Sequence, residues 1–260
     1  RPDLPHFTIT PRERQMQLFA QFGLDQAVIL PFDRALAHLP ARAFVEDILI
    51  GRLGVTHVVI GYDFSFGRDR AGTPDLMRAL GAELGFGVTV VAPVGNGGAV
   101  FSSSAVRGLL AQGDVAGANL ALGHRWRVSG RVVGGAKRGT GLGFPTANIA
   151  MPPATRLGHG IYAALVHVGG ERHAAAAYFG TRPQFDNGAA ILETFLLAFD
   201  GDLYGTEIGV AFVDFIRSDG AFEGVEALKA QMQRDCARAA EILARIAGSD
   251  PLAAMPLGGA

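Results

Sequence analysis

Apolar positions in the first half of the chain follow two alternating patterns. Apolar steps of three and four residues predict helices at residues 12–22, 41–53 and 74–84. Short apolar runs between and after them predict strands at residues 27–30, 56–60 and 88–91. Strands that alternate with helices at this spacing predict a parallel sheet with crossover helices, which is the architecture of nucleotide-binding α/β domains.

The pattern changes after Gly123. Segments rich in valine, threonine and aromatic residues are separated by glycine and proline clusters, at residues 127–133, 161–168, 173–179, 191–199 and 207–216. Such segments without long helices between them predict a small antiparallel barrel. An apolar face with helical spacing then predicts a closing helix at residues 225–246. We therefore expect an α/β domain at residues 1–122, a barrel domain at 123–248 and a flexible tail at 249–260.

Composition narrows the classes of partner. The 260 residues are 49% hydrophobic and carry 23 basic against 24 acidic side chains, so a broad surface for nucleic acid is not expected and any phosphate site is local. No apolar run reaches the ~20 residues of a membrane span, and no signal-peptide pattern opens the chain, so we expect a cytoplasmic protein without a membrane partner. The single Cys236 excludes an internal disulfide and fits a small core residue better than a nucleophile.

A glycine-rich loop precedes the most informative stretch. Five glycines lie between positions 134 and 143, together with Lys137 and Arg138, and such a loop lets backbone amides approach a phosphate closely. The Walker spacing is missing, and Phe144-Pro145 stands where a Rossmann fingerprint needs a helix to begin. Glycine content alone favours a phosphate loop and a plain flexible loop about equally.

The run Gly-Phe-Pro-Thr-Ala-Asn-Ile at residues 143–149 resembles the signature of riboflavin kinases. Further stretches are similar to the same family, at residues 160–163, 180–183, 192–194, 199–205 and 228–235. The resemblance implies a small antiparallel β-barrel of riboflavin-kinase type with a C-terminal helix.

The resemblance also implies roles for individual residues. Thr146 and Asn148 match the oxygen ligands of Mg²⁺, an ion that needs few protein ligands in phosphoryl transfer. Glu193 matches the catalytic base that accepts the proton of the 5'-hydroxyl of riboflavin. The ATP phosphates, with ATP as a substrate, would be bound by Gly135, Lys137, Gly139, Gly143, Thr146 and Asn148.

The chain departs from the family pattern close to Glu193. Phe195 and Ala198 replace a polar pair, Gln184 replaces a threonine, and Tyr178-Phe179 replaces Asn-Ile before the Arg-Pro turn. These departures leave an alternative open, a flavin- or nucleotide-binding module that has lost catalysis.

In the first half, Gly-Tyr-Asp-Phe-Ser-Phe-Gly at residues 61–67 follows the predicted strand 56–60, at the strand end where an α/β site belongs. It resembles a segment of the adenylyltransferase module that precedes the kinase barrel in bacterial bifunctional enzymes. The resemblance implies nucleotide or flavin binding by Asp63, Phe64, Phe66 and Arg68. Phe64 and Phe66 could stack on a ligand ring or simply pack together.

The run Ser-Ser-Ser-Ala-Val-Arg at residues 102–107 is similar to a second motif of that module. Hydroxyls and free amides at a helix start, with Arg107 one turn later, suit a triphosphate bound near Ser103 and Ser104. A serine helix cap is the alternative reading of the same residues.

The chain is thus similar to bifunctional riboflavin kinase/FAD synthetase enzymes, which implies riboflavin, FMN and ATP as partners: riboflavin is phosphorylated to FMN, and FMN is adenylylated to FAD when the protein is complete. That superfamily activates the α-phosphate with a His-x-x-His-type pair, and the seven histidines here include none. We expect that loop to precede Arg1, so that this chain is N-terminally truncated and makes no FAD. A monofunctional kinase with a structural first domain is the alternative.

Overall fold

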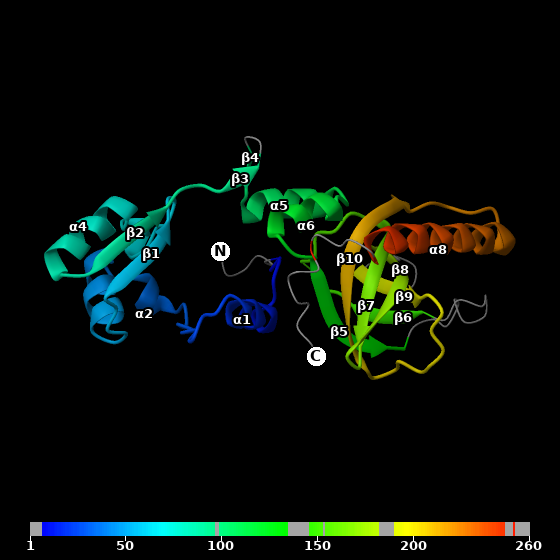
Figure 1. Ribbon diagram of the computed structural model, residues 1–260, viewed down its shortest axis with the longest axis horizontal. Coiled ribbons are helices and arrows are strands. Elements are labelled where there is room, and N and C mark those ends of the chain that lie inside the picture. Colours follow the sequence, from blue (N-terminus) through cyan, green and yellow to red (C-terminus); the bar gives the residue numbers. More distant parts are fainter. Residues whose placement is uncertain are drawn as a thin grey trace. The chain divides into compact units, whose positions relative to one another are not determined.

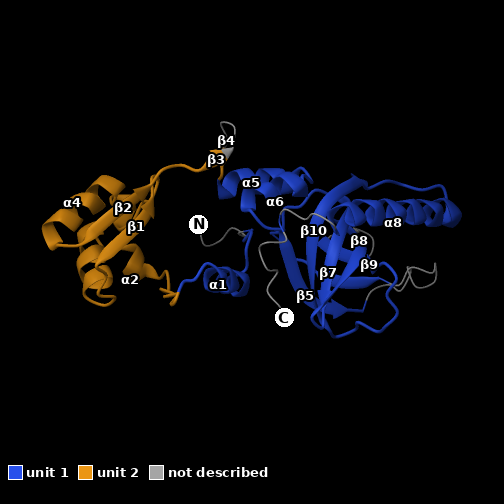
Figure 2. Cartoon of the chain, in the orientation of Figure 1, with its two compact units in different colours: residues 1–24, 102–260 blue, residues 25–101 orange. Residues whose placement is uncertain are grey.

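The computed structural model describes residues 7–96, 99–134, 146–152, 154–181, 190–247 and 252. The chain divides into two compact units, shown in different colours in Figure 2. The barrel unit comprises Arg1–Leu24 and Ser102–Ala260, and the α/β unit comprises Asp25–Phe101. Residues 102–122, which we assigned to the first domain, thus pack with the barrel, and the domain boundary at residue 122 stays a prediction.

The barrel unit is built on one closed antiparallel sheet (Figure 1). Its strands are β5 (Arg127–Val133), β6 (Ala147–Ala150), β7 (Gly160–Val168), β8 (Glu171–Thr181), β9 (Ala190–Leu196) and β10 (Glu207–Ser218). They follow one another around the barrel in the order β10, β5, β6, β9, β8, β7, and β7 pairs again with β10. Closure leaves no strand edge unpaired. The predicted antiparallel barrel is confirmed.

Aromatic side chains fill the barrel and its end. The rings of Trp126 and Phe212 stack with centroids 5.0 Å apart, and Tyr162 meets Phe212 edge to face at 5.3 Å. The Tyr162 hydroxyl donates a hydrogen bond to the carbonyl of Gly158, and burial raises the pKa of this phenol. Aromatic contacts of this kind add to the free energy of apolar burial, so this cluster anchors the fold.

Helices α1 (Arg12–Gln21), α5 (Ser103–Ala111) and α6 (Val115–Leu122) belong to the same unit. Asn119 of α6 donates to the Phe212 carbonyl at 2.9 Å and accepts from the Trp126 amide at 2.6 Å. The Trp126 indole donates to the Ile9 carbonyl at 2.9 Å, so the segment before α1 is also tied to the barrel.

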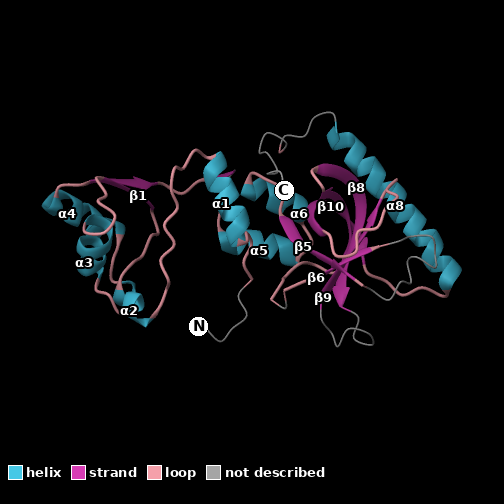
Figure 3. Cartoon of the chain, turned by 90° about the horizontal axis from the view of Figure 1, so that it is seen from below, coloured by secondary structure: helices cyan, strands magenta, loops and turns pink. Residues whose placement is uncertain are grey.

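The closing helix α8 (Val225–Ala247) packs on the outer faces of β7, β8 and β10 (Figure 3). One apolar cluster joins the helix to the strands and comprises Ala163, Leu165, Ala211, Val213, Ala239, Ile242 and Leu243. Arg217 of β10 adds an ion pair to buried Asp235 of α8, with 2.7 Å between Nη2 and Oδ2. The predicted closing helix is confirmed.

The α/β unit contains β1 (His57–Gly61) and β2 (Gly87–Val91), paired in parallel and connected through α4 (Pro74–Leu84). Thr73 caps α4 by accepting from the Leu76 amide at 3.2 Å, and Gly85 ends it with a φ of 81°. Shorter elements complete the unit, namely α2 (Arg34–Ala37), α3 (Ala41–Ala43), the π-helix η1 (Phe44–Ile50) and the 3₁₀ turn η2 (Arg68–Arg70). The predicted parallel sheet with a crossover helix is confirmed.

Several predicted elements differ from the structure. Residues 27–30 form no strand, and the side chain of Val28 is 57% exposed, because among the described residues no neighbouring strand pairs with this segment. Strand β9 ends at Leu196 rather than at residue 199. The pattern did not indicate β6, helices α2 and α6, or the hairpin of β3 (Gly95–Asn96) and β4 (Ala99–Val100). Within the described part of the chain, no helix combines the length and apolarity needed to cross a membrane.

Candidate active site

A polar row crosses neighbouring barrel strands. In the observed register Asn148 of β6 lies opposite Val133 of β5 on one side and Glu193 of β9 on the other, and Glu193 in turn lies opposite Tyr178 of β8. Directly paired residues of antiparallel strands have Cβ atoms about 4.5–5.5 Å apart on the same face. The register therefore brings together two of the side chains that the sequence singled out, Asn148 and Glu193.

The row lies on the outer face of the barrel. Ala147, Ile149 and Leu192 alternate with these polar residues and belong to the barrel core. Asn148 is nevertheless only 9% exposed, and its Oδ1 is buried without a hydrogen-bond partner among the residues that the structure describes. A buried carbonyl oxygen without a donor is a suitable ligand for a hard cation, so the site fits Mg²⁺.

Thr146 is half-buried and stands two positions before Asn148. Strand alternation places residues two apart on the same face, so the Thr146 hydroxyl and the Asn148 amide can serve one ion. Thr194 follows Glu193 but is directed to the barrel interior, where its Oγ1 is buried without a partner in the described parts of the chain.

Aromatic side chains flank the half-buried Glu193. Tyr178 is its direct neighbour on β8, and Phe195 is the next residue of β9 on the same face. The Tyr178 hydroxyl donates to Asp219 Oδ2 at 2.9 Å. In the sequence Tyr178 stood out only as a departure from the family pattern and Asp219 did not stand out, because the pairing of β7 with both β8 and β10 brings them together.

The turn after β9 contains one of the few residues other than glycine with positive φ. Ala198 has a φ of 52° and an exposed side chain. Residues with a Cβ are disfavoured in this left-handed region. Ala198, which replaces a polar residue of the family pattern, therefore adopts a backbone conformation that costs conformational free energy.

The remaining expectations for the kinase half lie outside the described residues. These are the phosphate loop residues Gly135, Lys137, Gly139 and Gly143, the departure at Gln184, and the tail at 249–260 apart from residue 252. Their roles stay predictions.

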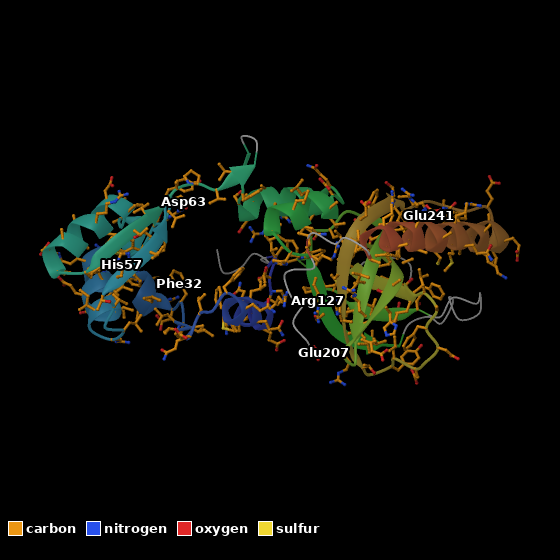
Figure 4. All side chains as sticks on the ribbon, viewed as in Figure 1. Phe32, His57, Asp63, Arg127, Glu207 and Glu241 are labelled. Atoms are coloured by element: carbon orange, nitrogen blue, oxygen red, sulfur yellow. The ribbon has the colours of Figure 1, made fainter. Side chains whose placement is uncertain are left out.

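The second group of expected residues follows β1 in the α/β unit. The Tyr62 amide donates to the Val91 carbonyl at 3.0 Å, which fixes the loop at the carboxyl ends of both parallel strands. Asp63 is exposed in this loop, and Figure 4 labels it. The structure thus places Asp63 at the strand end where an α/β domain binds ligands.

Phe64 and Phe66 stack on one another with centroids 5.6 Å apart, and Phe66 also contacts Phe44. Phe66 is buried in the core of the unit, and Phe64 is partly buried against it. Packing thus accounts for Phe66, whereas Phe64 retains some exposed surface. Arg68 is exposed, and its amide donates to the Leu39 carbonyl at 2.8 Å.

The serine run begins helix α5. Ser102 is the cap, because its hydroxyl accepts from the Ala105 amide at 3.1 Å. Ser103 and Ser104 are exposed in the first turn, whereas Arg107 is half-buried and donates to the Phe7 carbonyl at 3.1 Å. These residues belong to the barrel unit, and the motif around Asp63 belongs to the α/β unit.

Other candidate chemistry is weaker. Among the described residues no group of three or more His, Cys, Asp or Glu side chains could hold a metal ion. Burial and the neighbouring Asp235 raise the pKa of the half-buried Cys236 thiol to about 11, so it stays protonated at neutral pH. This agrees with the interpretation of Cys236 as a packing residue rather than a nucleophile.

A closed barrel with a paired amide and carboxylate, accompanied by a parallel α/β unit, suits a two-part enzyme that transfers groups from a nucleotide. Comparison with known families agrees with that class. The riboflavin kinase model matches residues 122–243, and the FAD synthetase model matches residues 1–105.

The relatives support the same assignment. The chain is 37% identical to the bifunctional riboflavin kinase/FMN adenylyltransferase of Escherichia coli (strain K12), over 87% of this chain and 73% of that protein. It is 37% identical to the enzyme of the same name from Pseudomonas fluorescens, over 85% and 72% of the two chains. The crystal structure of a macrolide-efflux protein from Streptococcus pneumoniae has a similar fold, with a TM-score of 0.79, 27% identity, and coverage of 87% and 73%. The chain belongs to the bifunctional riboflavin kinase/FMN adenylyltransferase family.

Proposed function

We propose that the barrel unit transfers the γ-phosphate of ATP to the 5'-hydroxyl of riboflavin and forms FMN. The observation that carries this proposal is the pairing of Asn148 with Glu193 on the outer face of the barrel, together with the buried and unused Oδ1 of Asn148 among the described residues. A metal ligand and a carboxylate held side by side are what a phosphoryl transfer to an alcohol requires.

In this proposal Thr146 and Asn148 hold Mg²⁺ through their side-chain oxygens. The bound ion would neutralise charge on the phosphate oxygens. Glu193 accepts the proton of the attacking hydroxyl, and its neighbours Tyr178 and Phe195 offer apolar surface to the flat flavin ring. The loop of Gly135, Lys137, Gly139 and Gly143 completes the phosphate site.

We further propose that two groups of residues, one in each unit, bind flavin or nucleotide, the ligands of FMN adenylylation. Asp63, Phe64 and Arg68 follow a parallel strand and keep exposed surface, whereas Phe66 supports them from the core of the unit. Ser103, Ser104 and Arg107 begin a capped helix, where free amides can bind phosphate. The positions of both groups in the fold are what supports this assignment.

The test of the kinase proposal is Thr146→Ala. The substitution removes a proposed oxygen ligand and little packing, so FMN formation from riboflavin, ATP and Mg²⁺ should be lost while thermal unfolding is unchanged. Ser129→Ala, on the neighbouring strand and exposed, is the matched control and should retain turnover. Full turnover by the Thr146 variant would refute the metal assignment. Riboflavin binding without turnover in the unmodified chain would instead favour the module that has lost catalysis.

A further inference from the structure

Cationic and imidazole side chains gather on the outer face of the barrel away from the strands that carry Asn148 and Glu193. His167 of β7 lies opposite Gly209 of β10 in the register. A Cβ atom at Gly209 would collide with the Nε and Nη2 atoms of Arg127, so the guanidinium of Arg127 lies across Gly209. The glycine thus allows the Arg127 side chain of β5 to extend over β10 toward the strand that carries His167.

Arg14 of α1 is only 8% exposed. Its Nη1 donates to Gln17 Oε1 at 3.1 Å, whereas its Nε and Nη2 are buried and have no hydrogen-bond partner among the residues that the structure describes. Nε and Nη2 form one edge of the guanidinium, and this edge binds oxyanions in a bidentate manner. The same molecule shows this, since Arg217 binds Asp235 through its Nε and Nη2 at 2.7–3.1 Å.

Two more nitrogen atoms of the barrel unit are in the same condition. Nη1 of Arg127 and Nε2 of His167 are also buried and unpartnered within the described parts of the chain. Buried polar groups normally have partners, and a buried charge without one is costly. Four nitrogen atoms from three side chains of the barrel unit therefore lack hydrogen-bond partners among the described residues, and His167 is a donor there when Nε2 carries the proton.

The charge of Arg14 also acts on Arg127 and His167. Burial, and then the positive charges of Arg127, Arg172 and Arg14, lower the pKa of His167 to about 4. The Arg14 charge, after burial, also lowers the pKa of Arg127, and Glu207 opposes it. Figure 4 labels Arg127 and Glu207 in this part of the barrel. The positive charges of three guanidinium groups thus lower the pKa of His167. The negative charge of Glu207 partly offsets that of Arg14 at Arg127.

We propose that Arg14, Arg127 and His167 form a binding site for a phosphate-class oxyanion, either free phosphate or the phosphate group of a nucleotide. A tetrahedral anion with several oxygens can accept from the edge of Arg14 and from the other two donors at once. The site uses α1, β5 and β7, so it is separate from the row on β6 and β9. Because its donors are shielded from solvent, the anion enters when α1 moves away and then holds α1 against the barrel.

The test is thermal unfolding in phosphate and in chloride at equal ionic strength. At a phosphate concentration about ten times Kd, the melting temperature of the barrel unit should rise by roughly 4 °C. Arg14→Gln should lose this rise. Arg12→Gln, an exposed arginine on the same helix, is the matched control and should keep it. An equal rise in all three proteins, or no rise in any, would overturn the proposal.

Four further measurements distinguish this site from other effects of phosphate. Arg14→Gln should not lower the melting temperature in phosphate-free buffer, because it removes a buried charge; if that variant fails to fold, His167→Gln takes its place. Thr146→Ala should keep the phosphate response, which separates this site from the proposed kinase centre. ADP in place of phosphate identifies the source, since a larger Arg14-dependent rise with ADP assigns the site to a nucleotide. Slower amide hydrogen exchange of α1 in phosphate supports the site, and unchanged exchange contradicts it.

Discussion

The two units bury their sheets to different extents. In the barrel unit every described strand is paired on both sides, and the interior is filled by residues such as Tyr162 and Phe212. In the α/β unit β1 and β2 pair only with one another among the described residues, and Val59 of β1 is 64% exposed. Parallel strands are normally covered on both faces, and a pair of strands is marginal by itself. The barrel is therefore a self-contained scaffold, whereas the described part of the α/β unit is not.

The same difference affects the two candidate sites. Asn148 and Glu193 are held by the register of paired strands, which fixes side chains precisely enough for chemistry. Asp63 and Arg68 lie exposed in the loop and short turn after β1. We therefore expect the kinase chemistry to be the more robust property of this chain.

The largest expected contrast lies between the two reactions. With riboflavin, ATP and Mg²⁺ this 260-residue chain should form FMN and no FAD, because it contains no His-x-x-His pair to stabilise the charge that develops in adenylyl transfer. Chromatography of the flavin products measures both at once. FAD formed at an enzymatic rate would contradict this expectation, since it would show that adenylyl transfer needs no such pair.

A core substitution in the α/β unit should lower the stability of that unit alone. Met77 is fully buried there, so Met77→Ala should destabilise this unit by about 2–5 kcal/mol. FMN formation should stay near the unmodified rate, because the barrel has its own core. Calorimetry and a kinase assay on the same sample test this, and a parallel loss of barrel stability would show that the units unfold together.

Acid should act on the barrel unit through His167. Its pKa of about 4 in the folded state lies below the ordinary value of 6.5, so the unfolded chain binds the proton first. The stabilising contribution is complete above pH 6.5 and is lost as the pH falls toward 4, by about 3 kcal/mol. Denaturant unfolding between pH 7 and pH 4 should therefore show a shallower loss for His167→Gln. If His167→Gln and the unmodified chain lost stability equally with falling pH, His167 would not be the group responsible.

The smallest effect concerns the turn beside the kinase site. Because Ala198 has a φ of 52°, Ala198→Gly should stabilise the barrel unit by about 0.5–1 kcal/mol. Ala190→Gly at the start of β9, where no positive φ is recorded, is the control and should destabilise. Chemical denaturation gives the free energy of unfolding of both variants. A lower value for Ala198→Gly than for the unmodified chain would contradict the claim that Ala198 is strained.

Much of the fold was predictable because periodicity is local. Helix α4 and strand β5 match their predicted ranges, since capping and alternation there agree with the fold. Strand β6 was missed because its four residues follow a glycine-rich loop and are too short to show alternation. The segment at residues 27–30 has the composition of a strand, but a strand also needs a partner, which local sequence does not supply.

The candidate site was predictable in part for a related reason. Two short motifs identified Asn148 and Glu193, whereas the hydrogen bond of Tyr178 to Asp219 and the buried edge of Arg14 depend on contacts between segments far apart in sequence. For Phe66 the motif left ligand stacking and packing open, and its burial in the core of the α/β unit favours packing.

The most direct test of the central claim is the rate of FMN formation by Glu193→Gln. The amide keeps the shape of the side chain and cannot accept a proton, so turnover should fall by about 10²-fold or more, while riboflavin affinity and the melting temperature change little. Glu171→Gln, an exposed carboxylate on β8, should retain full activity. A Glu193 variant that loses only riboflavin affinity, with turnover at saturation unchanged, would contradict the assignment of the barrel row as the catalytic centre.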